Sequence, residues 1–172
     1  MTKAIYFDMD GTIADLYGCE NWLADLINGY TRPYREAKSL VNMRKLGALL
    51  NKLQEAGYHI GVVSWLSKGG SEQYNQRVTE TKERWLERHL GAVSWDEVKI
   101  VPYGTPKQAV VEIPFGILFD DEARNRENWL GVAYDVDNIL EILSSLLWEK
   151  KEKSLTKYKK SVIINVENKK EK

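Results

Sequence analysis

Residues 4–12 read Ala4-Ile5-Tyr6-Phe7-Asp8-Met9-Asp10-Gly11-Thr12, an apolar run that ends in two carboxylates and a glycine. Side chains two positions apart on a strand lie on the same side of it, so Asp8 and Asp10 would face one site if the strand continues. Two such charges repel each other, and a cation beside them would offset the repulsion. Carboxylate oxygens are suitable ligands for Mg²⁺. The segment therefore indicates a magnesium site. The plainer alternative is an acidic turn after an edge strand.

The composition describes one globular domain. The chain has 172 residues, of which 43% are apolar and 29% charged, and this length is enough for a single core. No apolar stretch approaches the roughly 20 residues that cross a bilayer, and the first strand leaves no room for a secretory leader. We therefore expect a cytoplasmic protein without a membrane partner. Cys19 is the only cysteine, which excludes an intrachain disulfide and a thiolate zinc site.

The formal net charge is zero, but the charges are unevenly placed, because residues 149–172 carry nine Lys against four Glu. We interpret 149–172 as a charged, flexible tail that follows a catalytic domain at 1–148. A basic tail can also contact nucleic acid, although a short Lys/Glu-rich run is more often a solvated terminus. Residues 161–166 have strand-like content and would add to a sheet edge if they became ordered.

Strand-like and helical patterns alternate along the chain. Apolar residues recur with helical spacing through 40–53, 78–90 and 139–147, and the first of these helices is expected to end at Gly57. Ser71 and Asp137 are the expected N-caps of the other two, and Thr105-Pro106 would open a short helix. The expected strands are residues 3–8, 59–64, 98–101, 116–119 and 131–134. This order predicts a Rossmann-like α/β fold, with a parallel sheet of about five strands and helices on both faces.

Polar residues follow three of the expected strands at their carboxyl ends. They are Asp8, Ser64 and Asp120. In parallel α/β sheets, ligands bind beyond the carboxyl ends of the strands, near the point where the strand order reverses. The three residues are therefore expected to meet at one site.

These residues resemble the haloacid dehalogenase-like superfamily, whose phosphatases carry a D-x-D-G-T motif, a strand-end Ser or Thr, a Lys and a terminal acidic pair. The matching positions are Asp8 to Thr12, Ser64, Lys107 within Gly104-Thr105-Pro106-Lys107, and Asp120-Asp121. The resemblance covers roughly residues 3 to 135, and all four motifs occur in the family's order.

The resemblance implies a role for each motif. Asp8 would be the nucleophile that forms an aspartyl-phosphate, and Asp10 would be the general acid and base. Mg²⁺ would be held by Asp8, by the main-chain carbonyl of Asp10 and by an aspartate of the final pair. Asp120 is the preferred ligand, and Asp121 is the alternative.

Other residues would support the reaction around these aspartates. Ser64 would donate a hydrogen bond to a phosphate oxygen, and Lys107 would supply positive charge to the phosphoryl group and Asp8. Thr12 would support the loop, and it is a candidate substrate contact together with Trp65 and Lys68. These three have no stronger signal than their place beside the motifs.

The family's specificity comes largely from cap insertions, and little is inserted here. A small helical cap is expected at about 15–38, with room for one or two short helices. Its aromatic residues, which include Tyr17, Trp22 and Tyr34, would form a lid on which a base stacks or would pack onto the body, and we favour packing. Members with small caps act on large substrates or complete their sites by forming oligomers, so a homo-oligomer is a further possibility.

The leading functional interpretation is a magnesium-dependent phosphomonoesterase whose substrate is a nucleotide or another small phosphorylated metabolite. The small cap departs from the larger helical cap of the family's deoxyribonucleotidases. The open site and the basic tail suggest a second enzyme, a phosphatase of nucleic-acid ends, which we do not favour. The alternative of a different class is a non-catalytic module that keeps the fold for binding or regulation.

Overall fold

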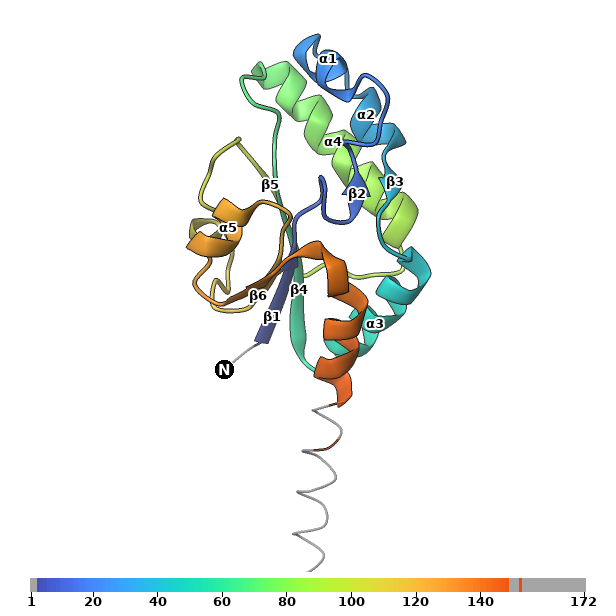
Figure 1. Cartoon of the computed structure of the whole chain (residues 1–172), viewed down its shortest axis with the longest axis vertical. Coiled ribbons are helices and arrows are strands. Elements are labelled where there is room, and N and C mark those ends of the chain that lie inside the picture. Colours follow the sequence, from blue (N-terminus) through green and yellow to red (C-terminus); the bar gives the residue numbers. More distant parts are fainter. Residues whose placement is uncertain (1–2, 149–151, 153–172) are drawn as a thin grey trace, which may run out of the picture.

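A five-stranded parallel sheet forms the centre of the computed structural model, which describes residues 3–148 and 152 (Figure 1). The strand order is β5-β4-β1-β6-β7, with every neighbouring pair parallel. The strands are β1 Lys3–Phe7, β4 Tyr58–Trp65, β5 Glu97–Val101, β6 Ile117–Phe119 and β7 Val132–Tyr134. The predicted α/β fold with a five-stranded parallel sheet is thus confirmed.

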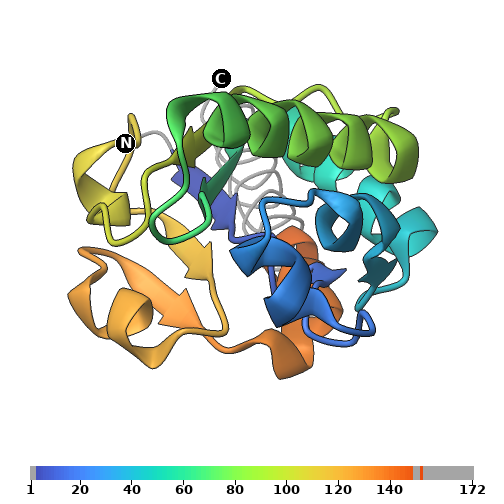
Figure 2. The same ribbon diagram turned by 90° about the horizontal axis from the view of Figure 1, so that it is seen from above.

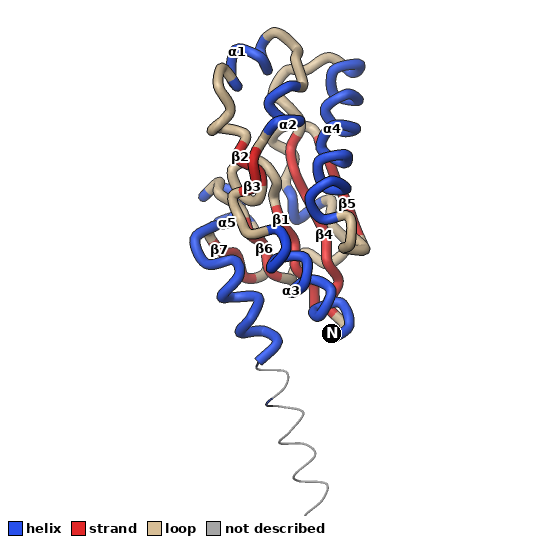
Figure 3. The backbone as a smooth tube through the Cα atoms, turned by 90° about the vertical axis from the view of Figure 1, so that its right-hand side faces the viewer, coloured by secondary structure: helices blue, strands red, loops and turns tan. Residues whose placement is uncertain are grey.

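Alternate side chains of the central strands point to opposite faces of the sheet, as the period of a strand requires. Ile5, Phe7 and Phe119 belong to the larger apolar core. That core also contains residues of α3 (Met43–Glu55), α4 (Glu72–Leu90) and the helix at 139–148, including Leu50, Trp85 and Leu143. In Figure 3, α3 lies beside β4, as its fully buried Leu46, Leu50 and Leu53 require.

The other face of the sheet has a smaller core. Ala4, Tyr6 and Leu118 pack there with Val111 and Trp129. This face is covered by the segment that follows a 3₁₀ turn at Lys107–Ala109 and by the region of α5 (Ala123–Asn128). Seen from above, α4 and α5 lie on opposite sides of the strands (Figure 2). Helical segments therefore cover both faces of the sheet.

The strand order reverses between β1 and β6. The chain moves from β1 through β4 to β5 on one side and then returns to β6 and β7 on the other. The backbone at the ends of these strands is tied together, since the Asp8 amide donates to the Phe119 carbonyl at 2.9 Å. A ligand site is expected beyond this point, because the two crossover connections diverge and leave a crevice there.

A small cap stands beyond the carboxyl ends of the strands. It is bounded by a two-stranded antiparallel pair, β2 (Ala14–Asp15) and β3 (Lys38–Ser39), and holds α1 (Trp22–Ile27) and α2 (Arg32–Glu36). In Figure 1, both helices lie beside the half of α4 that extends beyond the sheet. Tyr34 of α2 packs there with Tyr74 and Val78 of α4. The long helix α4 thus connects the cap to the body.

Several element boundaries differ from the sequence predictions. The α3 helix begins at Met43 rather than near Leu40, because the side chain of Asn42 accepts a hydrogen bond from the Lys45 amide and caps it. Ser71 caps α4 as predicted, and Gly57 follows α3 with a positive φ. The last helix is preceded by a 3₁₀ turn at Val136–Asn138 that Asp135, not Asp137, caps.

Within residues 3–148 and 152, no helix is long and apolar enough to cross a bilayer. The suggested strand at 161–166 and most of the predicted tail lie outside the described residues.

Candidate active site

The first half of the site is built around Lys107, which lies between two aspartates. Its ammonium Nζ is 3.0 Å from Oδ1 of Asp8 and 2.6 Å from Oδ2 of Asp120, and the lysine side chain is 1% exposed. Asp8 and Asp120 are supplied by the ends of β1 and β6, and Lys107 opens the 3₁₀ turn after β5. The topology thus brings together three predicted residues that are far apart in the sequence.

The two aspartates of the final pair have different environments. Both oxygens of Asp120 accept hydrogen bonds, from Lys107, from the Asn125 amide group and from the backbone N–H of Glu122. In Asp121, Oδ1 accepts from the Thr12 hydroxyl at 3.2 Å. Asp121 lines the pocket described below, whereas Asp120 is fully buried. Asp121 is therefore the member of the pair that is more accessible to a ligand.

The glycine turn makes room for Asp121. Gly11 has a φ of 76°, and a Cβ at this position would lie 2.4 Å from Oδ2 of Asp121. A side chain would therefore be strained by the backbone and would displace the carboxylate. Thr12 is fully buried, and its hydroxyl also accepts from the Asp121 amide at 3.1 Å. Its contacts are those of a residue that supports the loop, and it is not among the residues that line the pocket.

Three carboxylates can hold a cation. Asp8, Asp120 and Asp121 each offer an oxygen, and these oxygens all lie within 4.8 Å of one another. Oδ1 of Asp8 is buried and has no hydrogen-bond partner among the described residues, only the charge contact with Lys107. An all-oxygen donor set fits a hard divalent cation such as Mg²⁺. The side chain of Asp10 is not part of this group.

The second half of the site is built around a lysine that the sequence analysis missed. Nζ of Lys82, on α4, donates to Oδ2 of Asp10 at 2.6 Å, to Oγ of Ser64 at 2.9 Å and to the Trp65 carbonyl at 2.6 Å. Its side chain is 1% exposed. One signal was available, because Lys82 lies four residues after Val78 and three before Trp85, within the apolar stripe of the helix.

Burial and mutual repulsion perturb the carboxyl groups. Burial, and then the charges of Asp8 and Asp120, raise the pKa of Asp121 to about 7. Burial and the charge of Asp8 raise the pKa of Asp120 to about 6, although Lys107 opposes the shift. The pKa of Asp10 is raised too, because its burial outweighs the nearby charge of Lys82. Burial lowers the pKa of Lys107, but Asp8 and Asp120 outweigh that effect and raise it.

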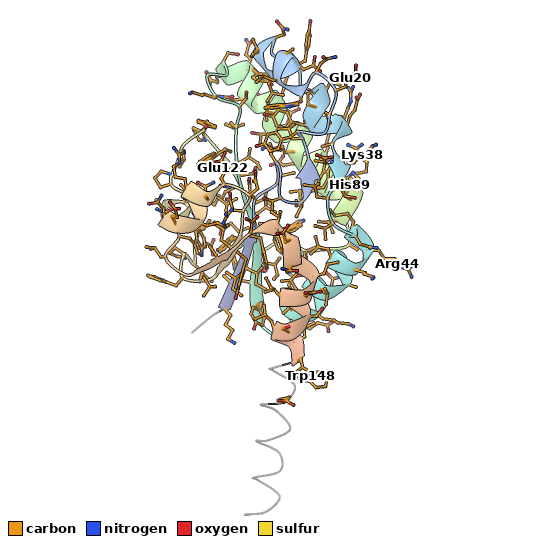
Figure 4. All side chains as sticks on the ribbon, viewed as in Figure 1. Glu20, Lys38, Arg44, His89, Glu122 and Trp148 are labelled. Carbon is orange, nitrogen blue, oxygen red and sulfur yellow. The ribbon has the colours of Figure 1, made fainter. Side chains whose placement is uncertain are left out.

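A pocket of about 650 Å³ opens above the carboxylates. Its floor includes Asp8, Asp10 and Asp121, and Glu122, labelled in Figure 4 near α5, also lines it. The predicted contacts Trp65 and Lys68 line the pocket as well, whereas Ser64 and Lys107 lie beneath it. The remaining lining residues come from the cap and from two loops of the body: Leu16, Tyr17, Trp22, Leu23, Leu26, Ile27, Tyr34, Leu66, Ser67 and Tyr103.

The expectation that the aromatic residues of the cap pack onto the body is correct for Tyr34 of α2, whereas Trp22 of α1 is not buried and lines the pocket. Pro33 and Tyr34 of α2 are buried. No residue of α1 is buried, and Leu23 and Ile27 are 54% and 76% exposed. The reason is geometric, because α1 lies across the pocket rather than against the sheet.

No protein-family model matches the sequence, and no curated protein matches it. Among solved structures, the chain is similar to the crystal structure of D,D-heptose 1,7-bisphosphate phosphatase from Burkholderia thailandensis. The TM-score is 0.54 and the identity is 14%, over 85% of this chain and 99% of that chain. At this identity the likeness shows the fold alone. It confirms the fold that the resemblance to haloacid dehalogenase-like phosphatases implies.

Proposed function

We propose that the protein is a magnesium-dependent phosphomonoester hydrolase that acts through an aspartyl-phosphate on Asp8. The observation that carries this proposal is the position of Lys107 between Asp8 and Asp120, with Asp121 beside them at the point where the strand order reverses. Phosphoryl transfer needs a positioned nucleophile and neutralisation of charge on the phosphate oxygens, and this arrangement is suited to both.

The reaction has two displacements at phosphorus. In the first, a carboxylate oxygen of Asp8 bonds to phosphorus, the bond to the ester oxygen breaks, and Asp10 gives its proton to the departing alkoxide. In the second, Asp10 takes a proton from water, the water oxygen bonds to phosphorus, and the bond to Asp8 breaks. Inorganic phosphate leaves, and both aspartates regain their starting forms. The raised pKa of Asp10 suits a carboxyl group that must begin the cycle protonated.

Mg²⁺ would be held by Asp8 and Asp121, with Asp120 and the main-chain carbonyl of Asp10 as further candidates, and would neutralise charge on the phosphate oxygens. We infer that Asp121 is the direct ligand of the pair. Asp120 already accepts from three groups, so it is suited to hold Lys107 and Asn125 in place. Ser64 would donate its hydroxyl proton to a phosphate oxygen.

The proposed substrate is a nucleotide or another small phosphorylated metabolite. A volume of about 650 Å³ lies within the usual range of small-molecule pockets, roughly 300–1,000 Å³. Trp65 and Lys68 are proposed substrate contacts because they line this pocket.

Phosphate release from an aryl phosphate and from a panel of mononucleotides, with and without Mg²⁺, tests the proposal. Asp8→Asn should lower kcat by on the order of 10³ or more, because the amide is a poor nucleophile. Asp137→Asn, which changes an exposed carboxylate outside the pocket, should leave kcat unchanged.

Comparable turnover by Asp8→Asn would overturn the assignment of the nucleophile. Turnover only on 3′- or 5′-phosphorylated oligonucleotides, lost when residues 150–172 are deleted, would favour the nucleic-acid end phosphatase instead. Inactivity on every ester would favour the non-catalytic module.

A further inference from the structure

The cap presents an apolar surface to the pocket instead of to a core. The α1 helix, Trp22–Ile27, has five apolar residues among six and buries none of them. Trp22, Leu23, Leu26 and Ile27 all line the pocket above the carboxylates. Apolar side chains gathered around a cavity and left exposed mark a surface that a ligand covers.

The opposite wall is made of aromatic rings held in place by the body. The indole N–H of Trp65 donates to the Thr105 carbonyl at 2.8 Å, which fixes its ring. Tyr103 lies against it with the ring centroids 5.0 Å apart and is 47% exposed. On the cap side, Tyr17 and Trp22 form a second pair, also 5.0 Å apart, in an edge-to-face arrangement. The pocket therefore has aromatic rings on both walls.

The charges of the pocket are concentrated at its floor. Of the described residues that line it, Lys68 alone is positively charged, and its ammonium lies 5.8 Å from the centre of the Tyr103 ring. Arg124 does not line the pocket, but its guanidinium lies 5.1 Å from the centre of the Trp65 ring on the body wall. A second phosphate beside α1 would face the apolar residues of that helix. Burial of an anion without paired donors is unfavourable, so the α1 wall is unsuited to a second phosphate.

We propose that the two aromatic walls bind the leaving group of a phosphate monoester whose alcohol carries a flat, uncharged ring, such as a nucleoside. This inference rests on the proposed function and adds a selection rule to it. The phosphate would lie at the carboxylate floor, and the ring would lie between Tyr103 and the Tyr17–Trp22 pair. Stacking on aromatic rings tolerates different bases, because every base has a π-face.

A matched pair of substrates tests the rule. Adenosine 5′-monophosphate and ribose 5-phosphate have the same kind of leaving oxygen and differ in the base. We expect kcat/KM to favour the nucleotide by at least about tenfold. Tyr103→Ala and Trp22→Ala should each lower kcat/KM for adenosine 5′-monophosphate far more than for ribose 5-phosphate, and so remove most of this preference. Phe115→Ala, which changes an exposed ring that does not line the pocket, should keep it.

Equal kcat/KM for the two esters, or a preference that survives both variants, would overturn the selection rule and leave the proposed function intact. Hydrolysis of neither ester, together with inactivity on the aryl phosphate and the other mononucleotides, would contradict the proposed function. In that case, binding of adenosine, which carries no phosphate, tests the ring site. Adenosine is titrated into the intact protein while tryptophan fluorescence is measured. Saturable quenching of the fluorescence that is weaker in Tyr103→Ala would support the ring site. The absence of saturable quenching would overturn it.

Lys82 carries a second inference from different contacts. It is a buried cation with three acceptors, the Asp10 carboxylate, the Ser64 hydroxyl and the Trp65 carbonyl. A hydroxyl has one proton to donate. Ser64 accepts a hydrogen bond from Lys82, so its own hydroxyl proton is not used in that contact. The hydroxyl can therefore donate this proton to a bound phosphate. The same ammonium holds Asp10 at 2.6 Å and thereby restricts the direction of its carboxylate.

The geometry points to Lys82 as a positioning residue, which holds Asp10 and Ser64 where the leaving oxygen and the phosphate meet them. This inference also rests on the proposed function. It differs from the role of Lys107, which contacts Asp8 and Asp120 instead. The side chain of Lys82 reaches the site from α4, the helix that also packs against the cap residue Tyr34.

The dependence of the rate on the leaving group separates positioning from general structural support. kcat/KM reports the first displacement, in which an alkoxide needs the proton of Asp10 and a nitrophenolate does not. Lys82→Met should therefore lower kcat/KM for an alkyl phosphate at least about tenfold more than for 4-nitrophenyl phosphate. In the Asp10→Asn background, this selective loss should disappear, because the two residues act as a unit.

Arg84→Met is the matched control, since Arg84 is on the same helix with its side chain 74% exposed and should show no selective loss. If Lys82→Met fails to fold by circular dichroism, Lys82→Arg keeps the charge but alters the contacts, and the same selective loss is expected. Equal losses on both esters, or the full selective loss in the Asp10→Asn background, would overturn the inference.

Discussion

The floor and the roof of the site distribute their side chains in opposite ways. The floor, made by the strand ends and by Lys82 and Lys107, buries charged groups that proteins usually expose. The roof, made by α1, exposes apolar groups that proteins usually bury. Charges are retained in the floor because each lysine neutralises aspartates within 3.0 Å. A substitution in the floor is therefore expected to change both the stability and the chemistry of the protein. A substitution in the roof is expected to change ligand binding with little effect on stability.

The largest effect on stability is expected from removing a floor lysine. Lys107→Met leaves Asp8 and Asp120 buried without their cation, and losing one partner of a buried pair costs about 3–5 kcal/mol. Urea unfolding at pH 8 without metal measures this loss. Lys52→Met, an exposed position on α3, should leave the midpoint unchanged. A similar midpoint for both variants would mean that the floor does not depend on charge pairing.

An intermediate effect is expected from pH, because the folded protein raises the pKa of Asp120 to about 6 and of Asp121 to about 7. Between the unfolded pKa near 3.8 and these values, the folded state binds more protons than the unfolded state. Its free energy of unfolding therefore falls as pH rises through this window. We expect the metal-free protein to have a higher Tm at pH 5 than at pH 8.

Mg²⁺ should raise Tm more at pH 8 than at pH 5, because protons compete with the cation for the same oxygens. Asp121→Asn and the wild-type protein share all other titrating groups, so the difference between their Tm values isolates the effect of Asp121. The variant should show a smaller change of Tm with pH and a smaller increase of Tm with Mg²⁺. Calorimetry with and without the metal measures these shifts. An unchanged response in Asp121→Asn would transfer the role of direct ligand to Asp120.

The smallest effect on stability is expected from the roof. Ile27→Ser changes a side chain that is 76% exposed, so the free energy of unfolding should change by less than about 0.5 kcal/mol. Leu50→Ala in the fully buried core should cost about 2–5 kcal/mol. Chemical denaturation of the two variants gives the contrast. A large loss in Ile27→Ser would mean that α1 contributes to the core and is not free to contact a ligand.

Local patterns were sufficient for much of the fold. Ser71, Gly57 and the apolar run of β4 gave correct elements, because caps, turns and strand periods depend on neighbours in the sequence. The strand pair β2–β3 and the helix α5 were not predicted. Strands of two residues and a helix of six residues are too short to show a clear hydrophobic periodicity. The start of α3 was missed because Asn42 outweighs the apolar residue Leu40.

The functional roles of the site residues stay predictions, but their proximity is now described. Asp8 and Asp120 were grouped correctly, because parallel strands deliver their carboxyl ends to one edge of a sheet. Lys107 was added to them through the family resemblance, and it lies between them. Lys82 was missed because its partners Asp10 and Ser64 lie 72 and 18 residues away in the chain. Nothing in a helical period identifies the partner of a buried lysine.

The sequence by itself determined the alternation of strands and helices and the residues that would meet at the strand ends, because both follow from periodicity and from the geometry of parallel sheets. Only the tertiary structure decided which oxygens of Asp120 and Asp121 are already bonded, that Lys82 reaches Asp10, and that α1 faces a pocket instead of a core. These depend on distances between segments far apart in the chain, and such distances are fixed only when the whole core packs.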